Sequence, residues 1–352
     1  MSEPLNPPSQ PIIIAGMHRS GTSLTASILQ QAGVSIGDQL LEASPGNAKG
    51  FFEDTDFLNL HQDILQSQGI SLEGWSTVGQ LTVPHQFWPR AQALCDRRLQ
   101  THSLWGWKEP RTTLFLDFWK QLLPQAKVIL PYRSPWEVVD SLFTRGDVAF
   151  LHNPNLATAI WLAYNQTVLA FYQRYPDDCF LFHCDFLKLD EQRFVEQVRQ
   201  KFNLPLTVPN QRLFDPTAMH HQVNQTHRPA LLAIHFPETL ELYTALQRLA
   251  DGPNPQSDEA TMPTQTKAIY RDWVLQDWLT SNRRRQTIQQ LKTELETVHV
   301  HLHQAKAERT HWQLVVKSME SDRFWRMRNA WVSLQKRLGL LSKEPAERKS
   351  EQ

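Results

Sequence analysis

The sequence predicts an α/β fold with a mainly parallel central sheet flanked by helices, followed by a long C-terminal coiled-coil helix. Short apolar strands at 12–14, 127–131 and 179–184 alternate with helical segments and carry no hairpin signals between them. This alternation is typical of parallel strands joined by helical crossovers. Near the C-terminus, apolar residues recur in heptads from Ile288 to Met319, which is typical of a coiled coil.

The elements follow from local pattern. A helix is expected from Thr22 to about Ala32, and another begins at Pro135, which suits a first helical turn. The turn-rich segment 36–50 and the irregular segment 69–86 are expected to be loops. Further helices are expected at about 54–67, 87–100, 113–122, 155–175 and 190–202, with a short strand-like segment at 105–111 that runs into a proline turn.

Composition restricts the classes of function. The 352 residues suffice for one large α/β domain and an additional part, and the net charge of zero argues against a nucleic-acid partner. From Arg271 onward, however, 16 Lys and Arg stand against 10 Asp and Glu. Three cysteines are too few for a disulfide framework or a zinc site, and no apolar run approaches a membrane span or a secretion signal. We therefore expect a cytoplasmic protein without a metal.

Changes in composition divide the chain into six parts. A polar, proline-bearing stretch separates the α/β domain from the heptads, and the sequence that follows the heptads mixes aromatic residues with five cations. The expected parts are a flexible N-terminus (1–10), the α/β domain (11–250), a linker (251–270), a helical coiled coil (271–320), a basic aromatic amphipathic helix (321–342) and a disordered tail (343–352).

The stretch from Pro11 to Gln30 carries the first chemical signal. A buried strand enters the glycine-bounded loop 16–21, and a helix follows. Loop N–H groups and the positive end of the helix dipole converge there, so the stretch is suited to an anion. The motif G-x-x-x-x-G-T-S matches the triphosphate P-loop motif G-x-x-x-x-G-K-[ST], except that Thr22 stands in place of the lysine. The nearest cation is Arg19. The alternative is a tight turn without a ligand.

The loop residues Arg19-Ser20-Gly21-Thr22 resemble the 5′-phosphosulfate loop of the sulfotransferases, bacterial type, that use 3′-phosphoadenosine 5′-phosphosulfate (PAPS). Those enzymes share the P-loop NTPase-like fold. The resemblance implies that Arg19 stabilises the bridging oxygen, while Ser20, Gly21, Thr22, Ser23 and the loop N–H groups hold the 5′-phosphate. His18 either assists the nucleotide or is structural.

A second stretch fits the same family. Arg133 ends a predicted strand and Ser141 lies eight residues on, in the next helix. In sulfotransferases an arginine and a serine at this spacing hold the 3′-phosphate, and the guanidinium fork suits phosphate oxygens. Since Ser141 lies about two turns down that helix, both side chains are expected to reach one phosphate. The alternative is a surface arginine and an ordinary helical serine.

The segment Gly50-Phe51-Phe52-Glu53 resembles an element of bacterial members in which the glutamate is the catalytic base. We therefore expect Glu53 to be the base; Asp54 and Asp56 are weaker candidates. The alternative is that Glu53 favours the dipole of the helix that begins near Asp54.

Two further segments carry candidate contacts with the sulfuryl group or the acceptor. The WKEPR segment resembles a K-[DE]-P-R element, so Lys108 is expected to be a catalytic cation and Arg111 a contact; the alternative is a salt-bridged loop. The segment from Leu213 to Pro216, with His220 and His221, resembles a late element near the nucleotide; the alternative is an exposed histidine pair. A zinc site at these histidines lacks further ligands nearby.

These resemblances imply transfer of a sulfuryl group from PAPS to a hydroxyl or amine, with glycans ahead of lipids and small metabolites as acceptors. The alternatives are a P-loop kinase-like phosphotransferase and a non-catalytic nucleotide-binding scaffold assembled through its coiled coil. We expect 288–319 to pair subunits in a homo-oligomer, with docking on another partner as the alternative. We expect 321–342 to contact an anionic membrane. The latter contact would place the protein at the periphery of the inner membrane. The alternative to membrane contact is that the helix at 321–342 caps a helical bundle.

Overall fold

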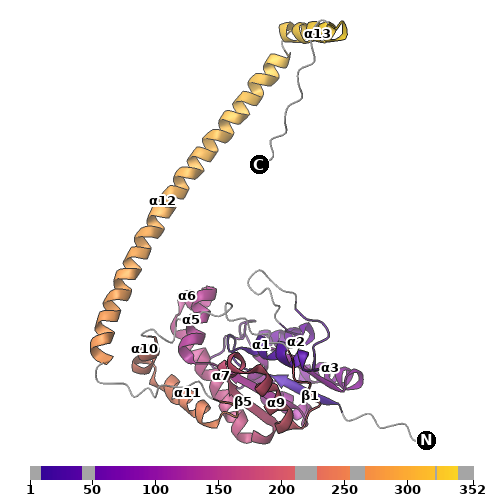
Figure 1. Cartoon of the computed structure of the whole chain (residues 1–352), viewed down its shortest axis with the longest axis vertical. Helices are drawn as coiled ribbons and strands as arrows, with labels where there is room; N and C mark the ends of the chain where they lie inside the picture. Colours follow the sequence, from indigo (N-terminus) through magenta and orange to yellow (C-terminus); the bar gives the residue numbers. More distant parts are fainter. Residues whose placement is uncertain (1–8, 42–51, 211–227, 254–265, 322, 340–352) are drawn as a thin grey trace, which may run out of the picture. The chain divides into compact units, whose positions relative to one another are not determined.

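The computed structural model describes residues 9–41, 52–210, 228–253, 266–321 and 323–339. The chain divides into two units, the first ending at Tyr270 and the second beginning at Arg271. Figure 1 shows the α/β elements of the first unit and the helices α12 and α13 of the second.

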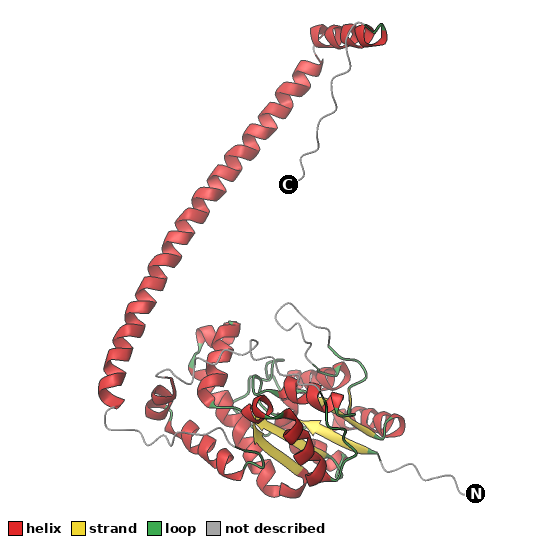
Figure 2. Cartoon of the chain, viewed as in Figure 1, coloured by secondary structure: helices red, strands yellow, loops and turns green. Residues whose placement is uncertain are grey.

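The first unit is built on a five-stranded, all-parallel sheet with strand order β2-β3-β1-β4-β5. Figure 2 shows its strands in yellow among helices. The predicted parallel α/β fold is therefore confirmed. The edge strand β2 was not predicted, because two residues are too few to show an alternating pattern. The strands are β1 (Gln10–Ile14), β2 (Ser35–Ile36), β3 (Leu104–Lys108), β4 (Lys127–Tyr132) and β5 (Cys179–His183).

Helices cover both faces of this sheet. On one face Ile13, Trp107 and Leu130 belong to a core with the buried faces of α2, α3 and α7. On the other face Ile14 and Phe182 pack with α1 and α9. The helices are α1 (Thr22–Gln31), α2 (Thr55–Ser67), α3 (Trp88–Thr101), α4 (Leu116–Leu122), α5 (Pro135–Arg145), α6 (Val148–His152), α7 (Asn155–Arg174), α8 (Asp185–Leu189), α9 (Glu191–Phe202), α10 (Arg228–His235) and α11 (Pro237–Leu249), with 3-10 turns η1 (His85–Phe87), η2 (Pro110–Phe115) and η3 (Pro176–Asp178).

Burial on both faces explains why the strands read as continuous apolar runs. The predicted helices at 22–32, 54–67, 87–100, 155–175 and 190–202 are present within two residues of their expected bounds. The helix expected at 113–122 begins instead as the 3-10 turn η2, and α4 starts only at Leu116. The short helices α6 and α8, with five residues each, were not predicted because one turn shows no period.

The register of the strands places the starts of four loops at one edge of the sheet. Ile14 at the end of β1 pairs with Lys108 at the end of β3, and Tyr132 at the end of β4 pairs with His183 at the end of β5. β1 lies between β3 and β4. The loops that leave these strands therefore start side by side at the carboxyl edge, where open α/β sheets bind ligands.

The second unit consists of α12 and α13 (Figure 1). α12 runs from Thr266 to Ser321 and α13 from Arg323 to Arg337. α12 starts within the segment 251–270 that composition marks as a linker. In the parts of the chain that the structure describes, no helix combines the length and apolar character needed to cross a bilayer.

Candidate functional site

The loop after β1 is held close to its neighbours. A Cβ at Gly16 would lie 2.6 Å from the carbonyl oxygen of Pro131, and a Cβ at Gly21 would lie 2.9 Å from the Cβ of Cys184. Gly21 has a φ of 83° and Arg19 a φ of 66°, so both are left-handed. A left-handed conformation is uncommon for a residue with a side chain, and here it sets the direction of Arg19 at the turn.

The start of α1 offers its N–H groups to an anion. Gly21 is the N-cap residue and supplies no side-chain cap, and the first turn holds no acidic residue. Thr22 is buried and Ser20 Oγ is also buried, without a hydrogen-bond partner among the described residues. An uncapped helix N-terminus beside an unpartnered hydroxyl is suited to an anionic group.

Arg133 directly follows β4, and its side chain is held by Glu137 in the first turn of α5. Its Nη2 donates to Glu137 Oε1 at 3.3 Å, and Ser134 Oγ donates to Glu137 Oε2 at 2.6 Å. Burial raises the pKa of the Glu137 carboxyl, but the charge of Arg133 and the hydrogen bonds from Ser134 and Arg133 together outweigh burial, and the pKa lies below its ordinary value. Glu137 is therefore a carboxylate that orients the guanidinium of Arg133.

The two predicted anion-binding stretches meet. Arg19 Nε donates to Ser141 Oγ at 2.8 Å, across 122 positions of sequence. Arg133 Nη1 donates to the carbonyl oxygen of Arg19 at 3.3 Å. Arg19, Arg133 and Ser141 thus form one polar cluster rather than two separate pockets.

Positive charge is concentrated in this cluster. Burial lowers the pKa of the Arg19 guanidinium first, and the nearby cations Arg145 and Arg133 lower it further. An arginine remains charged in spite of such shifts. Several cations held together at the carboxyl edge of a sheet favour a ligand with more than one negative charge.

Glu53 and Lys108 form an ion pair. Lys108 Nζ lies 2.8 Å from Glu53 Oε1, and the Lys108 side chain is 1% exposed whereas that of Glu53 is 13% exposed. Burial lowers the pKa of Lys108, and the attraction of Glu53 raises it in part. The structure therefore brings together two of the residues that sequence assigns to catalysis.

The neighbouring carboxylates have structural roles. Asp54, not Glu53, caps α2, because Asp54 Oδ1 accepts from the N–H of Asp56 at 2.9 Å. Arg98 Nη2 contacts Asp54 at 2.8 Å and Asp56 at 3.0 Å. Burial of Asp54 raises its pKa to about 6. Both aspartates are thus engaged in holding the start of α2 and Arg98.

Arg111 is part of a buried network. Glu109 accepts from His61 Nδ1 at 2.6 Å and pairs with Arg111 Nη1, and Arg111 Nε donates to the carbonyl oxygen of Leu72 at 2.6 Å. The other ring nitrogen of His61, Nε2, accepts a hydrogen bond from Trp119 Nε1 at 2.9 Å. For Arg111 the structure supports the salt-bridged loop, which ties the segment around Leu72 to the sheet.

His18 packs against Trp75, and no sequence pattern marks Trp75 as a site residue. The two ring centroids are 4.9 Å apart. Burial lowers the pKa of His18 well below 6.5, and Arg111 lowers it further, so the imidazole is neutral at pH 7. Its Nε2 is buried and has no hydrogen-bond partner within the described ranges. His18 is thus not a cation for a phosphate.

The Trp75 side chain lies beside the loop after β1, and its neighbours hold it in place. The guanidinium of Arg145 lies 5.1 Å from its ring centre, and the ring of Phe150 lies 5.0 Å away. The preceding residue, Gly74, has a φ of 77° and its carbonyl accepts from Tyr164 Oη at 2.9 Å. The segment 69–86 has no regular pattern, so only the isolated Gly74-Trp75 pair in a loop hinted at this role.

A histidine, a cysteine and an aspartate meet at the end of β5. His183, Cys184 and Asp185 bring ligand-type atoms within 4.8 Å of one another. Protein contacts account for them: His183 Nδ1 accepts from the N–H of Asp185 at 3.2 Å, and Asp185 pairs with Lys188. Burial raises the pKa of the Cys184 thiol to about 12. The sequence did not predict this cluster.

Some predicted contacts lie outside the described residues, namely His220, His221 and the segment from Leu213 to Pro216. Ser23 follows Thr22 in the first turn of α1, where it is half-buried. Of the other predicted residues, His18, Arg19, Ser20 and Gly21 lie in the loop after β1, and Lys108 and Arg111 flank the end of β3.

Comparison with known proteins identifies the family. A family model described as "Sulfotransferase family" matches residues 11–208, which is more than half of the chain. The chain therefore belongs to the sulfotransferase family. A comparison with curated protein sequences gave no match.

Three solved structures are similar to this chain at low sequence identity. The sulfotransferase domain of the Synechococcus PCC 7002 olefin synthase is 19% identical, with 72% of this chain and 99% of that chain covered and a TM-score of 0.40. A sulfotransferase from Alicyclobacillus acidocaldarius is 12% identical, with 71% and 98% covered and a TM-score of 0.41. A sulfotransferase from Mycobacterium avium is 12% identical, with 70% and 78% covered and a TM-score of 0.41.

The Glu109 network predicts a pH-dependent loss of stability. Burial alone would raise the pKa of Glu109, but Arg111 and then His61 lower it from 4.5 to about 2. Glu109→Gln should reduce the free energy of unfolding at pH 7 by about 3 kcal/mol, because it leaves Arg111 buried without its counter-ion. The difference from wild type should shrink as the pH falls from about 4.5 toward 2, where the native carboxylate is protonated.

Urea unfolding at a series of pH values measures this difference. Glu196→Gln is the matched control, since Glu196 pairs with Arg199 on the surface of α9. The control should follow wild type at every pH. Equal stability of Glu109→Gln and wild type at pH 7 would contradict the assignment of Glu109 as the structural centre of this network.

Proposed function

We propose that this sulfotransferase moves a sulfuryl group from PAPS to a hydroxyl or amine of an acceptor. The hydrogen bond from Arg19 to Ser141 is the observation that carries the proposal. It joins the loop expected at the 5′-phosphosulfate to the helix expected at the 3′-phosphate. A single nucleotide with phosphates at both ends is the ligand that such a joined site fits.

The described residues fit this donor. The uncapped start of α1 and the buried Ser20 hydroxyl suit the 5′-phosphate. Arg133, oriented by Glu137, presents a guanidinium near Ser141 for the 3′-phosphate. On binding, Arg19 and Ser141 exchange their mutual hydrogen bond for nucleotide oxygens, so that Arg19 faces the bridging oxygen.

PAPS supplies an activated sulfuryl group whose phosphate leaves as 3′-phosphoadenosine 5′-phosphate. The protein's part is to position the acceptor, stabilise charge on the leaving oxygen and remove the acceptor proton. Arg19 is placed for the second task. Glu53 takes the proton as general base, and its 13% exposed side chain leaves an oxygen accessible to an acceptor.

The ion pair couples these steps. While Glu53 is charged it holds Lys108 at 2.8 Å. When Glu53 accepts the proton its attraction for Lys108 ends, and the ammonium is then available to the sulfuryl oxygens. Lys108 is 1% exposed, so a charge without a partner there is costly. Negative charge on the sulfuryl group replaces the one that Glu53 loses.

For the acceptor we propose a glycan hydroxyl first, and a lipid or small metabolite second. His220 and His221 are the proposed direct contacts, and Arg111, which the sequence also marks as a contact, has another role. We propose further that Arg111 acts on the acceptor indirectly, by fixing the loop that bears Trp75, because its donors already bind Glu109 and Leu72.

Transfer of radiolabelled sulfate from PAPS to panels of glycans and lipids tests the activity. Glu53→Gln should lower turnover on the best acceptor by at least roughly 100-fold. The same variant should bind 3′-phosphoadenosine 5′-phosphate as wild type does, because Glu53 is not a nucleotide contact. Asp63→Asn is the matched control, since Asp63 lies on the exposed side of α2 and pairs with Arg90.

The control should transfer sulfate at the wild-type rate. Unchanged turnover of Glu53→Gln would remove Glu53 as the base. Tight binding of the nucleotide without transfer to any acceptor would favour the non-catalytic scaffold instead.

We also propose that α13 binds anionic membrane surfaces, which would place the protein at the periphery of a membrane. Its large side chains Phe324, Met327 and Trp331 are 84%, 69% and 61% exposed. They recur at steps of three and four, as on one face of a helix. Basic residues accompany this face, and a basic, aromatic amphipathic helix suits an anionic lipid interface. The cations are Arg323, Arg326, Arg328, Lys336 and Arg337.

Liposome flotation of the full chain tests this second proposal. Wild type should float with vesicles that contain phosphatidylserine and not with phosphatidylcholine vesicles. Phe324→Ser with Trp331→Ser should reduce flotation at least about tenfold, because both apolar contacts are lost. Asn329→Ser is the control on the same helix. Equal flotation with both vesicle types, or no effect of the double substitution, would overturn it.

A further inference from the structure

The heptad stripe of α12 leaves a long apolar face in solvent. The eight large apolar side chains at a and d positions are each between 47% and 63% exposed: Ile288, Leu291, Leu295, Val298, Leu302, Trp312, Val316 and Met319. Helices in water draw most of their stability from packing such a face. The stripe from Ile288 to Met319 is about 48 Å long at 1.5 Å per residue, so a partner helix of similar length would cover it.

We infer that this partner is a second copy of the chain, and that the two copies of α12 pair in parallel and in register over residues 288–319. The stripe is continuous at steps of three and four, which places Ile288, Leu295, Leu302, Arg309 and Val316 at a. The d positions are Leu291, Val298, Ala305, Trp312 and Met319. Branched residues at a with leucine at d favour two strands, and the stripe begins with that combination.

The flanking positions are compatible with the parallel direction. In a parallel pair each g residue of one helix faces the e residue five positions later on the other. Glu294 then faces His299 and Glu308 faces Gln313, so that no two like-charged side chains meet at these positions. An antiparallel pair would place g against g and e against e.

Arg309, the charged residue in the stripe, fixes the register. In a parallel pair in register, the side chain at this a position enters a hole formed by Ala305, Glu308, Arg309 and Trp312 of the other copy. Alanine leaves room, Glu308 supplies the opposite charge and Trp312 offers an aromatic face. The long stem of Arg309 lets the guanidinium reach the edge of the seam. Antiparallel pairing centred on the same stretch would set Arg309 against the apolar Val298.

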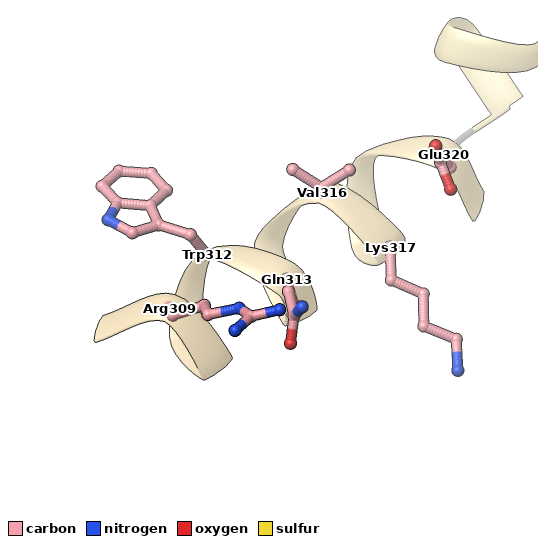
Figure 3. A pocket seen from close by; sticks show the side chains of 6 residues that line it. All are labelled: Arg309, Trp312, Gln313, Val316, Lys317 and Glu320. Atoms are coloured by element: carbon pink, nitrogen blue, oxygen red, sulfur yellow. The ribbon is translucent and has the colours of Figure 1, made fainter. Parts of the chain in front are cut away.

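The surface around Trp312 has the matching shape. Figure 3 shows a hollow on α12 with Trp312 and Val316 projecting from the same side of the helix. Its lining includes Arg309, Trp312, Gln313 and Val316. These are positions a, d, e and a, the four residues that receive a d side chain from a parallel partner. Lys317 and Glu320 also line the hollow, so four of its six lining residues are those that would surround Trp312 of the second copy.

Sedimentation equilibrium of the full chain, with a monomer mass of 40.9 kDa, tests the pairing. Wild type should sediment as a dimer at micromolar concentration. Leu302→Asp, at a, should weaken dimerisation at least about 100-fold because it buries a charge in the seam. Leu314→Asp is the matched control, because Leu314 lies on the opposite, f side of the same helix and is 62% exposed. The control should stay dimeric.

Disulfide trapping tests direction and register. The three native cysteines are buried, so an introduced thiol is the reactive one. Leu291→Cys, at d, should form a disulfide-linked dimer on mild oxidation, whereas Thr293→Cys, at f, should not. Circular dichroism of Leu302→Asp should show reduced helix content, since an unpaired helix frays.

A monomeric or trimeric wild type would overturn the inference. So would a dimer that Leu302→Asp and Leu314→Asp leave equally intact, because the stripe would then not be the interface. A dimer in which Leu291→Cys fails to crosslink would overturn the parallel, in-register arrangement. Loss of sulfate transfer leaves the inference untouched, since the pairing does not rest on catalysis.

Discussion

The position of β1 between β3 and β4 is the constraint on which the site depends. Because all three strands are parallel, the P-loop, Lys108 and Arg133 leave the sheet at the same edge. Only a residue without a side chain allows β3 to lie this close to β1: a Cβ at Gly106 would come 2.1 Å from the carbonyl oxygen of Ile12. The contact between Arg19 and Ser141 is a consequence of this order.

Three buried cations at this edge are paired with carboxylates, whereas Arg19 donates to Ser141. The pairs are Arg133 with Glu137, Lys108 with Glu53 and Arg111 with Glu109. The three pairs differ in how much of the carboxylate side chain is exposed to solvent. Glu109 is completely buried and Glu137 nearly so, whereas the Glu53 side chain is 13% exposed. This difference, rather than the presence of a carboxylate, separates a candidate base from carboxylates that orient arginines.

Local patterns allowed much of the fold and part of the site to be predicted. Ile12 to Ile14, Gly16 and Gly21 mark a strand, a tight loop and a helix within a few residues, and the structure has them there. The link between Arg19 and Ser141 spans 122 positions, and only topology brings them together. Asp is a preferred N-cap residue and Glu is not, so the sequence already favoured Asp54 over Glu53 as the cap, and the hydrogen bond from the N–H of Asp56 shows it. Trp75 lies in a segment without periodicity, and its packing on His18 depends on tertiary contacts alone.

The central claim is that Arg133 and the P-loop hold opposite ends of one nucleotide. Calorimetric titration of wild type and Arg133→Ala with 3′-phosphoadenosine 5′-phosphate and with 5′-AMP tests it most directly. Loss of the guanidinium should weaken the bisphosphate at least about tenfold, since charge-assisted contacts to one phosphate disappear. Binding of 5′-AMP, which lacks the 3′-phosphate, should be unchanged. Equal losses for both nucleotides would contradict the claim.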